Sequence, residues 1–335
     1  MSDKESYIIV SMSPLPESFM KALFAPYSSQ LDKPIDVIAV SPKDSMEKIK
    51  EALEKADVVI GDYSFSLPIT AEMCEYMKNV RLIAQPSTGY DHIDIEACAK
   101  KGIPVANVGG ANAVSVAEYT IMTAIALLRR LIKAHLDVSE GKWSQWELME
   151  LGTYDLYGKT WGIIGFGRIG REVAKRLRGF DVKILYYDKY RLPEEKEAEL
   201  GVKYAPLPKL LKLSDIVSIH VPLTSETEKM IGEKELRLMK PTAILINPSR
   251  GEIVDEEALA RALSEGWIMG AAVDVYSVEP PGTDHPLIKL KNVNIIRTPH
   301  IAGATTDARS RIIMTTIENV VRVLKGEPPI NVVNM

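Results

Sequence analysis

The chain has 335 residues, of which 46% are apolar and 26% charged, and its formal net charge is −4. This length exceeds that of one typical domain, so we expect two domains of ordinary globular composition. The chain has neither a basic cluster nor an apolar run of membrane-spanning length, so we expect no nucleic-acid partner and no membrane partner. The polar first residues do not resemble a signal peptide, which favours a cytoplasmic location. Two cysteines, Cys74 and Cys98, are too few for a disulfide framework or a metal site, and we expect both in the core and no bound metal.

Short, β-branched apolar runs alternate with amphipathic segments in the first third of the chain. Such alternation predicts a parallel sheet with helices on both of its faces. The runs that we interpret as strands are 7–10, 37–40, 58–61, 81–84 and 104–108, and helical patterns occupy 46–56 and 69–78. A longer and more apolar helix is expected next, from about 115 to 138.

The same alternation restarts after this long helix. The strand-like runs are 160–165, 182–188, 216–222, 243–249, 270–276 and 292–299, and helical patterns include 168–180, 255–266 and a final segment at about 304–325. The fold class that we predict is therefore α/β, with two doubly wound parallel-sheet domains.

A glycine-rich turn follows the predicted strand 160–165 directly, with glycines at Gly165, Gly167 and Gly170. The first glycine permits a tight turn, the second lets the backbone approach a pyrophosphate, and the third lets helix and strand pack closely. The pyrophosphate would lie at the helix N-terminus, beside the N–H groups of Arg168 and Ile169. The pattern predicts a dinucleotide site.

An acidic residue at the end of the following strand supports this interpretation, because its carboxylate bonds the ribose hydroxyls. Asp188 ends the predicted strand 182–188. A carboxylate at this position repels the 2′-phosphate of NADP, so we predict NAD as the cofactor, with NADP less favoured. Arg191 follows closely and could soften this preference, and the alternative is a loop arginine without such a role.

Three residues that could perform hydride-transfer chemistry follow the ends of predicted strands, where ligands bind in open α/β sheets. Arg250 follows 243–249, Glu279 follows 270–276 by a few residues, and His300 ends the run that starts at 292. Reduction of a 2-oxo acid needs a cation for the carboxylate and a general acid for the carbonyl oxygen. His220 also ends a strand, and strand-end position alone leaves both histidines open as the acid.

Several blocks in order show that the chain resembles the D-2-hydroxyacid dehydrogenase family, and within it most closely the glyoxylate/hydroxypyruvate reductase branch. The blocks are STGYDHID (87–94), SVAEYTIMTAIALLRR (115–130), YGKTWGIIGFGRIGREVAKR (157–176), HVPLTSETEKMI (220–231), LMKPTAILINPSRGEIVDEEAL (238–259), GAAVDVYSVEPP (270–281), TPHIAG (298–303) and PPINVVN (328–334). The resemblance covers nearly the whole chain.

This resemblance implies a role for each residue of the strand-end trio. Arg250 would bind and polarise the substrate, His300 would be the acid/base, and Glu279 would hydrogen-bond His300 and favour the imidazolium. The backbone amides of Thr88 and Gly89 would receive the substrate carboxylate. His220 then takes a cofactor-side role.

The resemblance also implies further cofactor contacts and a domain arrangement. Asp274 would hold the nicotinamide amide, and the backbone near Val221 and Pro222 would line the adenosine half. In this family the cofactor domain is inserted within the substrate domain. We therefore expect a discontinuous, flavodoxin-like substrate-binding domain of residues 1–108 plus 304–335, and a Rossmann dinucleotide-binding domain of residues 109–303, with the active site in a cleft between them.

Family members are typically dimeric through the cofactor domain, so a homodimer is implied here. Trp143 and Trp146 lie between the long helix and the glycine-turn strand. Similar reductases send a tryptophan of this segment toward the partner's active site, and a tryptophan that only packs in the dimer is the equal alternative.

The segment 62–70 bears on the choice of substrate. It has no lysine or arginine, whereas related phosphoglycerate dehydrogenases carry arginine there, and Tyr63, Ser64 and Phe65 suit a small uncharged tail. We therefore expect a small 2-oxo acid, glyoxylate or hydroxypyruvate. D-3-phosphoglycerate dehydrogenase, a phosphite dehydrogenase and a non-catalytic NAD-sensing regulator on the same fold stay open. Glu279 disfavours a formate dehydrogenase, in which glutamine replaces it, and the distal trio disfavours a Rossmann methyltransferase.

Overall fold

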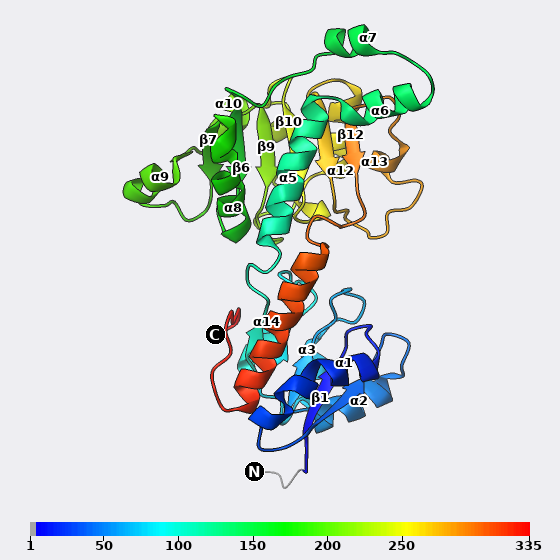
Figure 1. Cartoon of the computed structure of the whole chain (residues 1–335), viewed down its shortest axis with the longest axis vertical. Helices are drawn as coiled ribbons and strands as arrows, with labels where there is room; N and C mark the ends of the chain where they lie inside the picture. The colour runs from blue at the N-terminus through cyan, green and yellow to red at the C-terminus, as the bar shows by residue number, and fades with distance from the viewer. Residues whose placement is uncertain (1–4) are drawn as a thin grey trace. The chain divides into compact units, whose positions relative to one another are not determined.

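The computed structural model describes residues 5–335 and separates into two compact units (Figure 1). The first unit runs to Asn112 and resumes at Thr306, and the second is Ala113–Thr305. Each unit has its own parallel sheet, so the prediction of two parallel-sheet α/β domains is confirmed. No helix among the described residues is long and apolar enough to cross a membrane.

The first unit has a five-stranded parallel sheet in the order β2-β1-β3-β4-β5, which is the flavodoxin-like order. Its strands are β1 (Tyr7–Ser11), β2 (Ile35–Ala39), β3 (Val58–Ile60), β4 (Ile83–Ala84) and β5 (Val105–Ala106). Its helices are α1 (Glu17–Phe24), η1 (Ala25–Gln30), α2 (Met46–Lys55), α3 (Ala71–Tyr76), α4 (Ile95–Lys100) and α14 (Thr306–Leu324).

Two apolar clusters, one on each face, enclose this sheet. One cluster contains residues of α2, α3 and α4, and the other contains residues of α1 and α14. Cys74 and Cys98 lie in the first cluster with their Sγ atoms 3.4 Å apart, so both are core residues. The returning helix α14 belongs to this unit because Ile317, Val320 and Leu324 pack into the second cluster.

The second unit has a seven-stranded parallel sheet in the order β12-β11-β10-β9-β6-β7-β8, which is the Rossmann order. Its strands are β6 (Thr160–Ile164), β7 (Lys183–Tyr187), β8 (Val202–Tyr204), β9 (Ile216–Ile219), β10 (Ile244–Asn247), β11 (Gly270–Val273) and β12 (Ile295–Arg297). Its helices are α5 (Ala113–Leu128), α6 (Leu131–Ser139), α7 (Gln145–Glu150), α8 (Arg168–Leu177), η2 (Arg178–Phe180), α9 (Glu194–Leu200), α10 (Leu207–Leu213), α11 (Glu233–Leu236), η3 (Gly251–Ile253), α12 (Glu256–Ser264) and α13 (Pro286–Lys289).

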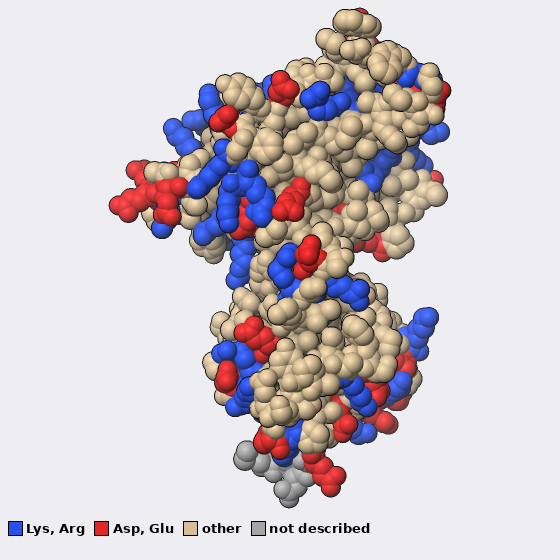
Figure 2. Space-filling model, in the orientation of Figure 1, with Lys and Arg blue, Asp and Glu red and all other residues tan. Residues whose placement is uncertain are grey.

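Helices cover both faces of this sheet as well. Residues of α5 and α8 pack on one face around Trp161, and residues of α10, α11 and α12 pack on the other around Leu245. In Figure 2 acidic side chains gather over α9, with a basic group beside them, whereas the surface over α7 is largely uncharged.

The prediction of one continuous helix over 115–138 is wrong. The helix ends at Leu128, and a second helix begins at Leu131. Arg130 between them has a left-handed backbone with φ of 49°, and its guanidinium donates to the carbonyls of Gly152 and Leu151 at 3.0 and 2.7 Å. These long-range bonds stabilise a break that the apolar periodicity does not reveal.

Candidate active site

Three glycines lie in the turn between β6 and α8 and in the first turn of α8. Beside one of them the space that a Cβ would occupy is empty, and beside the other two it is filled by protein atoms. A Cβ at Gly165, whose φ is 92°, would lie 2.6 Å from the carbonyl carbon of His220. A Cβ at Gly170 would lie 2.3 Å from the Gly165 carbonyl oxygen, whereas a Cβ at Gly167 would meet nothing within 4 Å. Gly167 is exposed and caps α8 without a side chain. The N-terminus of α8 therefore has empty space beside Gly167 in which an anion could lie.

Asp188 fastens the glycine turn to the end of β7. Its Oδ2 accepts a hydrogen bond from the Phe166 N–H at 2.7 Å, and its Oδ1 accepts one from the Tyr190 N–H at 2.9 Å. Each carboxylate oxygen can accept a second bond, so the half-buried group keeps capacity for ribose hydroxyls. The guanidinium of Arg191 donates to Glu197 at 3.0 Å and lies 5.3 Å from the Tyr204 ring centroid, so it is engaged with α9.

His220 ends β9 beside the glycine turn and is unsuited to be the acid. Its N–H donates to the Ile164 carbonyl at 2.6 Å, and its Nε2 lies 3.0 Å from Ser218 Oγ. Burial lowers the pKa of His220 to about 3, so the imidazole is neutral near pH 7. Val221 and Pro222 continue from it at the same end of the sheet, Val221 half-buried and Pro222 exposed.

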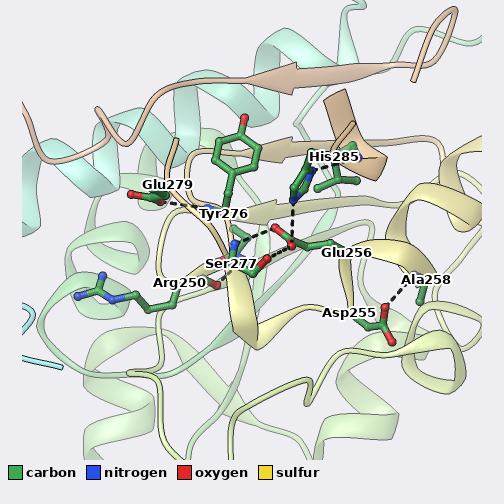
Figure 3. Close-up of polar contacts among 10 residues, drawn as sticks. Arg250, Asp255, Glu256, Ala258, Tyr276, Ser277, Glu279 and His285 are labelled. Carbon is green, nitrogen blue, oxygen red and sulfur yellow. Dashed lines mark hydrogen bonds and ion pairs between the residues drawn. The ribbon is translucent and has the colours of Figure 1, made fainter. Parts of the chain in front are cut away.

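The strand-end trio follows three neighbouring strands, because Arg250 comes after β10, Glu279 after β11 and His300 after β12. The backbone after Arg250 packs directly on the backbone that leads to Glu279, since a Cβ at Gly251 would lie 2.1 Å from the Tyr276 carbonyl carbon. In Figure 3 the side chains of Arg250 and Glu279 extend toward the same side. The Rossmann sheet thus brings these groups to one edge.

His300 and Glu279 form a hydrogen-bonded pair, with His300 Nδ1 2.8 Å from Glu279 Oε2. The other oxygen, Oε1, accepts the Tyr276 N–H at 3.0 Å. Burial acts to raise the pKa of Glu279, but the His300 hydrogen bond, the Tyr276 N–H and the charges of His300 and Arg250 outweigh it, and the pKa is lowered overall. A carboxylate held ionised on Nδ1 leaves Nε2 of the half-exposed imidazole as the nitrogen that can exchange a proton with a ligand.

Asp274 is fully buried and holds the loop that carries His300. Its Oδ1 accepts from the Thr298 hydroxyl and the Ile301 N–H, and its Oδ2 accepts from the Ala302 N–H, at 2.5, 2.8 and 2.7 Å respectively. Its own carbonyl accepts the His300 N–H at 2.7 Å. His300 has φ of 53°, an uncommon conformation for a residue with a side chain, and these bonds fix it. Burial raises the pKa of Asp274.

Several residues that support the trio carry no signal in the sequence. The Tyr119 hydroxyl of α5 lies 2.7 Å from Thr298 Oγ1 and extends the network behind Asp274. Glu256, Ser277 and His285 form a cluster beside Glu279 (Figure 3). In the sequence, Glu256 is indistinguishable from any acidic residue in the first turn of a helix. Its contacts with Ser277 and His285 exist only in the folded chain.

In the first unit, Thr88 and Gly89 lie in a loop after β4. The Thr88 hydroxyl donates to Asn112 Oδ1 at 2.8 Å, and its carbonyl accepts from Asn107 Nδ2 at 2.8 Å. The N–H groups of Thr88 and Gly89 have no internal acceptor among residues 5–335, so both remain available to an anion.

The loop after β3 is held by a buried carboxylate in the same unit. Asp62 accepts hydrogen bonds from the N–H groups of Ser64, Ser66 and Leu67 at 2.8, 2.9 and 3.0 Å. Tyr63 is exposed at the loop tip. The loop therefore presents hydroxyl and aromatic groups, and it has no lysine or arginine in its sequence.

A Rossmann-ordered sheet, a dinucleotide turn closed by Asp188 and a histidine–carboxylate pair beside an arginine define the second unit as that of an NAD-dependent dehydrogenase. Residues 121–302 match the family model described as D-isomer specific 2-hydroxyacid dehydrogenase, NAD binding domain. The chain belongs to this family, and the resemblance seen in the sequence is confirmed.

Known relatives and solved structures agree with this assignment. A glyoxylate reductase of Korarchaeum cryptofilum is 49% identical over 268 residues, 80% of each chain. A D-3-phosphoglycerate dehydrogenase of Archaeoglobus fulgidus is 41% identical over 267 residues, 80% of this chain and 50% of that one. The crystal structure of a glyoxylate reductase from Paecilomyes thermophila superposes with a TM-score of 0.84 at 28% identity and covers 98% of this chain and 99% of that one.

Proposed function

We propose that the protein transfers a hydride between NAD(H) and a small 2-oxo or D-2-hydroxy acid, with reduction of glyoxylate or hydroxypyruvate as its main reaction. The observation that carries the proposal is the His300–Glu279 pair, 2.8 Å apart. Its two residues follow the neighbouring strands β12 and β11, and Arg250 follows β10 on the other side of β11. This arrangement supplies an acid for a carbonyl oxygen and a cation for a carboxylate. The identity to glyoxylate reductases supports the substrate class.

The residues of this chain would act in distinct ways. Arg250 binds the substrate carboxylate and polarises the carbonyl, and the N–H groups of Thr88 and Gly89 receive the carboxylate. His300 gives its Nε2 proton to the carbonyl oxygen, and Glu279 stabilises the imidazolium before that step. In the reverse reaction His300 accepts the proton.

The glycine turn fits a dinucleotide, because the empty space beside Gly167 adjoins the N-terminus of α8, where a pyrophosphate could lie. Asp188 would bond the ribose hydroxyls, and Val221 and Pro222 would line the adenosine half. When bound, the nicotinamide supplies or accepts the hydride. The Asp274 carboxylate would hold the nicotinamide amide.

A phosphorylated substrate is the second candidate, because a D-3-phosphoglycerate dehydrogenase is among the relatives. The loop 62–70 argues against it, since Tyr63, Ser64 and Phe65 offer no cation to a phosphate. A non-catalytic NAD sensor would share the trio, so only turnover separates it from an enzyme.

A homodimer formed through the cofactor domain belongs to the same proposal. Large apolar side chains of α5, α6, α7 and the segment before α7 are exposed, and they include Met122, Leu131, Leu136, Trp143 and Trp146. Trp143 is 81% exposed and Trp146 71% exposed, which is unusual for a side chain of this size. Exposed apolar area of this kind marks a protein interface, whether or not either tryptophan reaches the partner's active site. A cytoplasmic location remains a prediction.

Initial rates test the proposal directly. NADH and NADPH are each assayed with glyoxylate, hydroxypyruvate, pyruvate and 3-phosphohydroxypyruvate, and we expect the highest kcat/KM for NADH with glyoxylate or hydroxypyruvate. Replacing His300 with Ala should lower this value by about 10²- to 10⁴-fold while NADH binding is retained. NADH binding without turnover of any of the four acids would favour the sensor, and near-normal turnover in the His300 variant would refute the assigned role.

A further inference from the structure

Glu256, the first residue of α12, collects hydrogen bonds from both ends of the segment that carries Glu279 (Figure 3). Its Oε1 accepts the Ser277 N–H at 3.1 Å, and its Oε2 accepts the Ser277 hydroxyl. The same Oε2 lies 3.1 Å from His285 Nε2. The side chain of Glu256 is only 11% exposed, so these bonds are largely shielded from water.

The tautomer of His285 follows from its second contact. Its Nδ1 accepts the Leu287 N–H at 3.3 Å, as a cap at the start of α13. A ring nitrogen that accepts has no proton, so Nε2 carries the proton and donates to Glu256. All three groups that face the Glu256 carboxylate are therefore donors, and the histidine donates without being charged.

Glu279 lies between the two attachment points, Ser277 and His285. The residue before the first point, Tyr276, donates its N–H to Glu279 Oε1 at 3.0 Å, and its ring meets the His285 ring edge-on with centroids 5.5 Å apart. Gly251 packs directly against the backbone of Tyr276. The backbone around Glu279 is thus held at both ends by one carboxylate and on one side by the chain that follows Arg250.

We propose that Glu256 is a positioning residue that acts through Glu279, by fixing the segment 277–285 so that the Glu279 carboxylate stays on Nδ1 of His300. Glu256 touches neither substrate nor cofactor in this assignment, and its kinetic part rests on the proposed dehydrogenase function. The cluster of Glu256, Ser277 and His285 would set the protonation of the acid without joining the reaction.

The substitution Glu256→Gln is a sharp test because it keeps the size of the side chain. The amide oxygen still accepts, but the amide nitrogen turns a donor toward groups that are themselves donors, so at least one of the three bonds is lost. Glu257→Gln is the matched control, since Glu257 is the next residue of α12 and is exposed. Ser277→Ala removes only the hydroxyl and keeps the backbone N–H, so its effect should be smaller.

The pH dependence of kcat/KM reports a change in the His300–Glu279 pair that a general loss of structure does not produce. The titratable and charged groups around the pair are Arg250 and Tyr276 beside Glu279, and Asp274 beside His300. If Glu279 moves away, the imidazolium loses its partner, and the alkaline limb of the reduction profile shifts to lower pH. We expect this shift in Glu256→Gln with kcat at pH 7 lowered roughly tenfold, and neither change in Glu257→Gln.

Imidazole ¹⁵N shifts of His300, assigned with a His300→Ala variant, give a readout that needs no turnover. We expect a smaller protonated fraction of His300 at pH 7 in Glu256→Gln, with NADH affinity and Tm close to those of Glu257→Gln. Unchanged His300 shifts together with an unchanged pH profile would overturn the proposal. A loss of Tm or of NADH binding that fully accounts for the lower rate would also overturn it. Absence of wild-type turnover would instead refute the proposed function, and the shifts would still decide the role of Glu256.

Discussion

Gly251 and Tyr276 are in direct backbone contact, and a Cβ at position 251 would lie 2.1 Å from the Tyr276 carbonyl carbon and 2.2 Å from the Ser277 nitrogen. The φ of Gly251 is not in the left-handed region, so the glycine is needed for close approach and not for its conformation. This contact is what sets the chain after Arg250 against the chain before Glu279.

Replacing Gly251 with Ala adds only one methyl group, but it should lower both the stability of the protein and the rate of the reaction. Two rigid backbone segments must separate, and we expect a loss of about 1–3 kcal/mol in the free energy of unfolding. Because the separation moves Arg250 relative to Glu279, kcat/KM should fall by at least tenfold even at temperatures where the variant is folded. Denaturant unfolding and initial rates measure both effects. Gly232→Ala, where the nearest atom to a Cβ is 3.6 Å away, is the control.

Asp188 holds the glycine turn, and under the proposed function it also sets the cofactor preference, so its replacement should have two effects. In Asp188→Ser the 2′-phosphate of NADP no longer meets a carboxylate, so the ratio of kcat/KM for NADPH to that for NADH should rise. The Phe166 N–H loses its charged acceptor, so binding of both cofactors should weaken by a few fold. Steady-state kinetics with each cofactor tests this. An unchanged ratio would mean that another residue sets the preference.

The elements that the sequence predicted best are those whose signal is local. The run 160–165, the glycines at Gly165, Gly167 and Gly170, and the strand ending near Asp188 form one contiguous pattern, and the structure has β6, α8 and β7 there. The strand-end positions of Arg250, Glu279 and His300 follow from the same β/α rhythm. The strand β8 (VKY) was not predicted, because only one of its residues is buried and no apolar run marks it, unlike the equally short β3 (VVI).

What the sequence could not reveal depends on contacts between distant residues. The break at Arg130 depends on the carbonyls of Gly152 and Leu151, about twenty positions away. The internal bonds of Asp274 come from three residues beyond β12, so its carboxylate could be assigned only a cofactor role from the family pattern. Glu256 lies in a generic helix start, and its partners follow a different strand.

Acid should weaken the contribution of Glu279 to stability. Its pKa is lower in the folded chain than the usual 4.5, so the folded state gains from its ionised form above that pH and loses the gain as pH falls through the folded pKa. The difference in Tm between the wild type and Glu279→Gln should therefore be positive at pH 7 and shrink as the pH is lowered below 4.5. Thermal unfolding across this range, with Glu257→Gln as the control, measures it. A difference that grows on acidification would contradict the assigned sign.

Thr298 joins Tyr119 to Asp274, and removing its hydroxyl should loosen the loop that carries His300. In Thr298→Val the buried Asp274 carboxylate keeps the Ile301 and Ala302 N–H groups but loses its third donor, at a cost of about 1–3 kcal/mol in the free energy of unfolding. His300 is held in its left-handed conformation by bonds to Asp274, so kcat should fall as well. Tyr119→Phe is the control, because it leaves all three donors to Asp274 in place and should cost only about 1 kcal/mol. Chemical denaturation and kcat at saturating NADH measure these effects. An equal loss of kcat in both variants would show that the hydroxyl pair, and not the carboxylate that it supports, governs the loop.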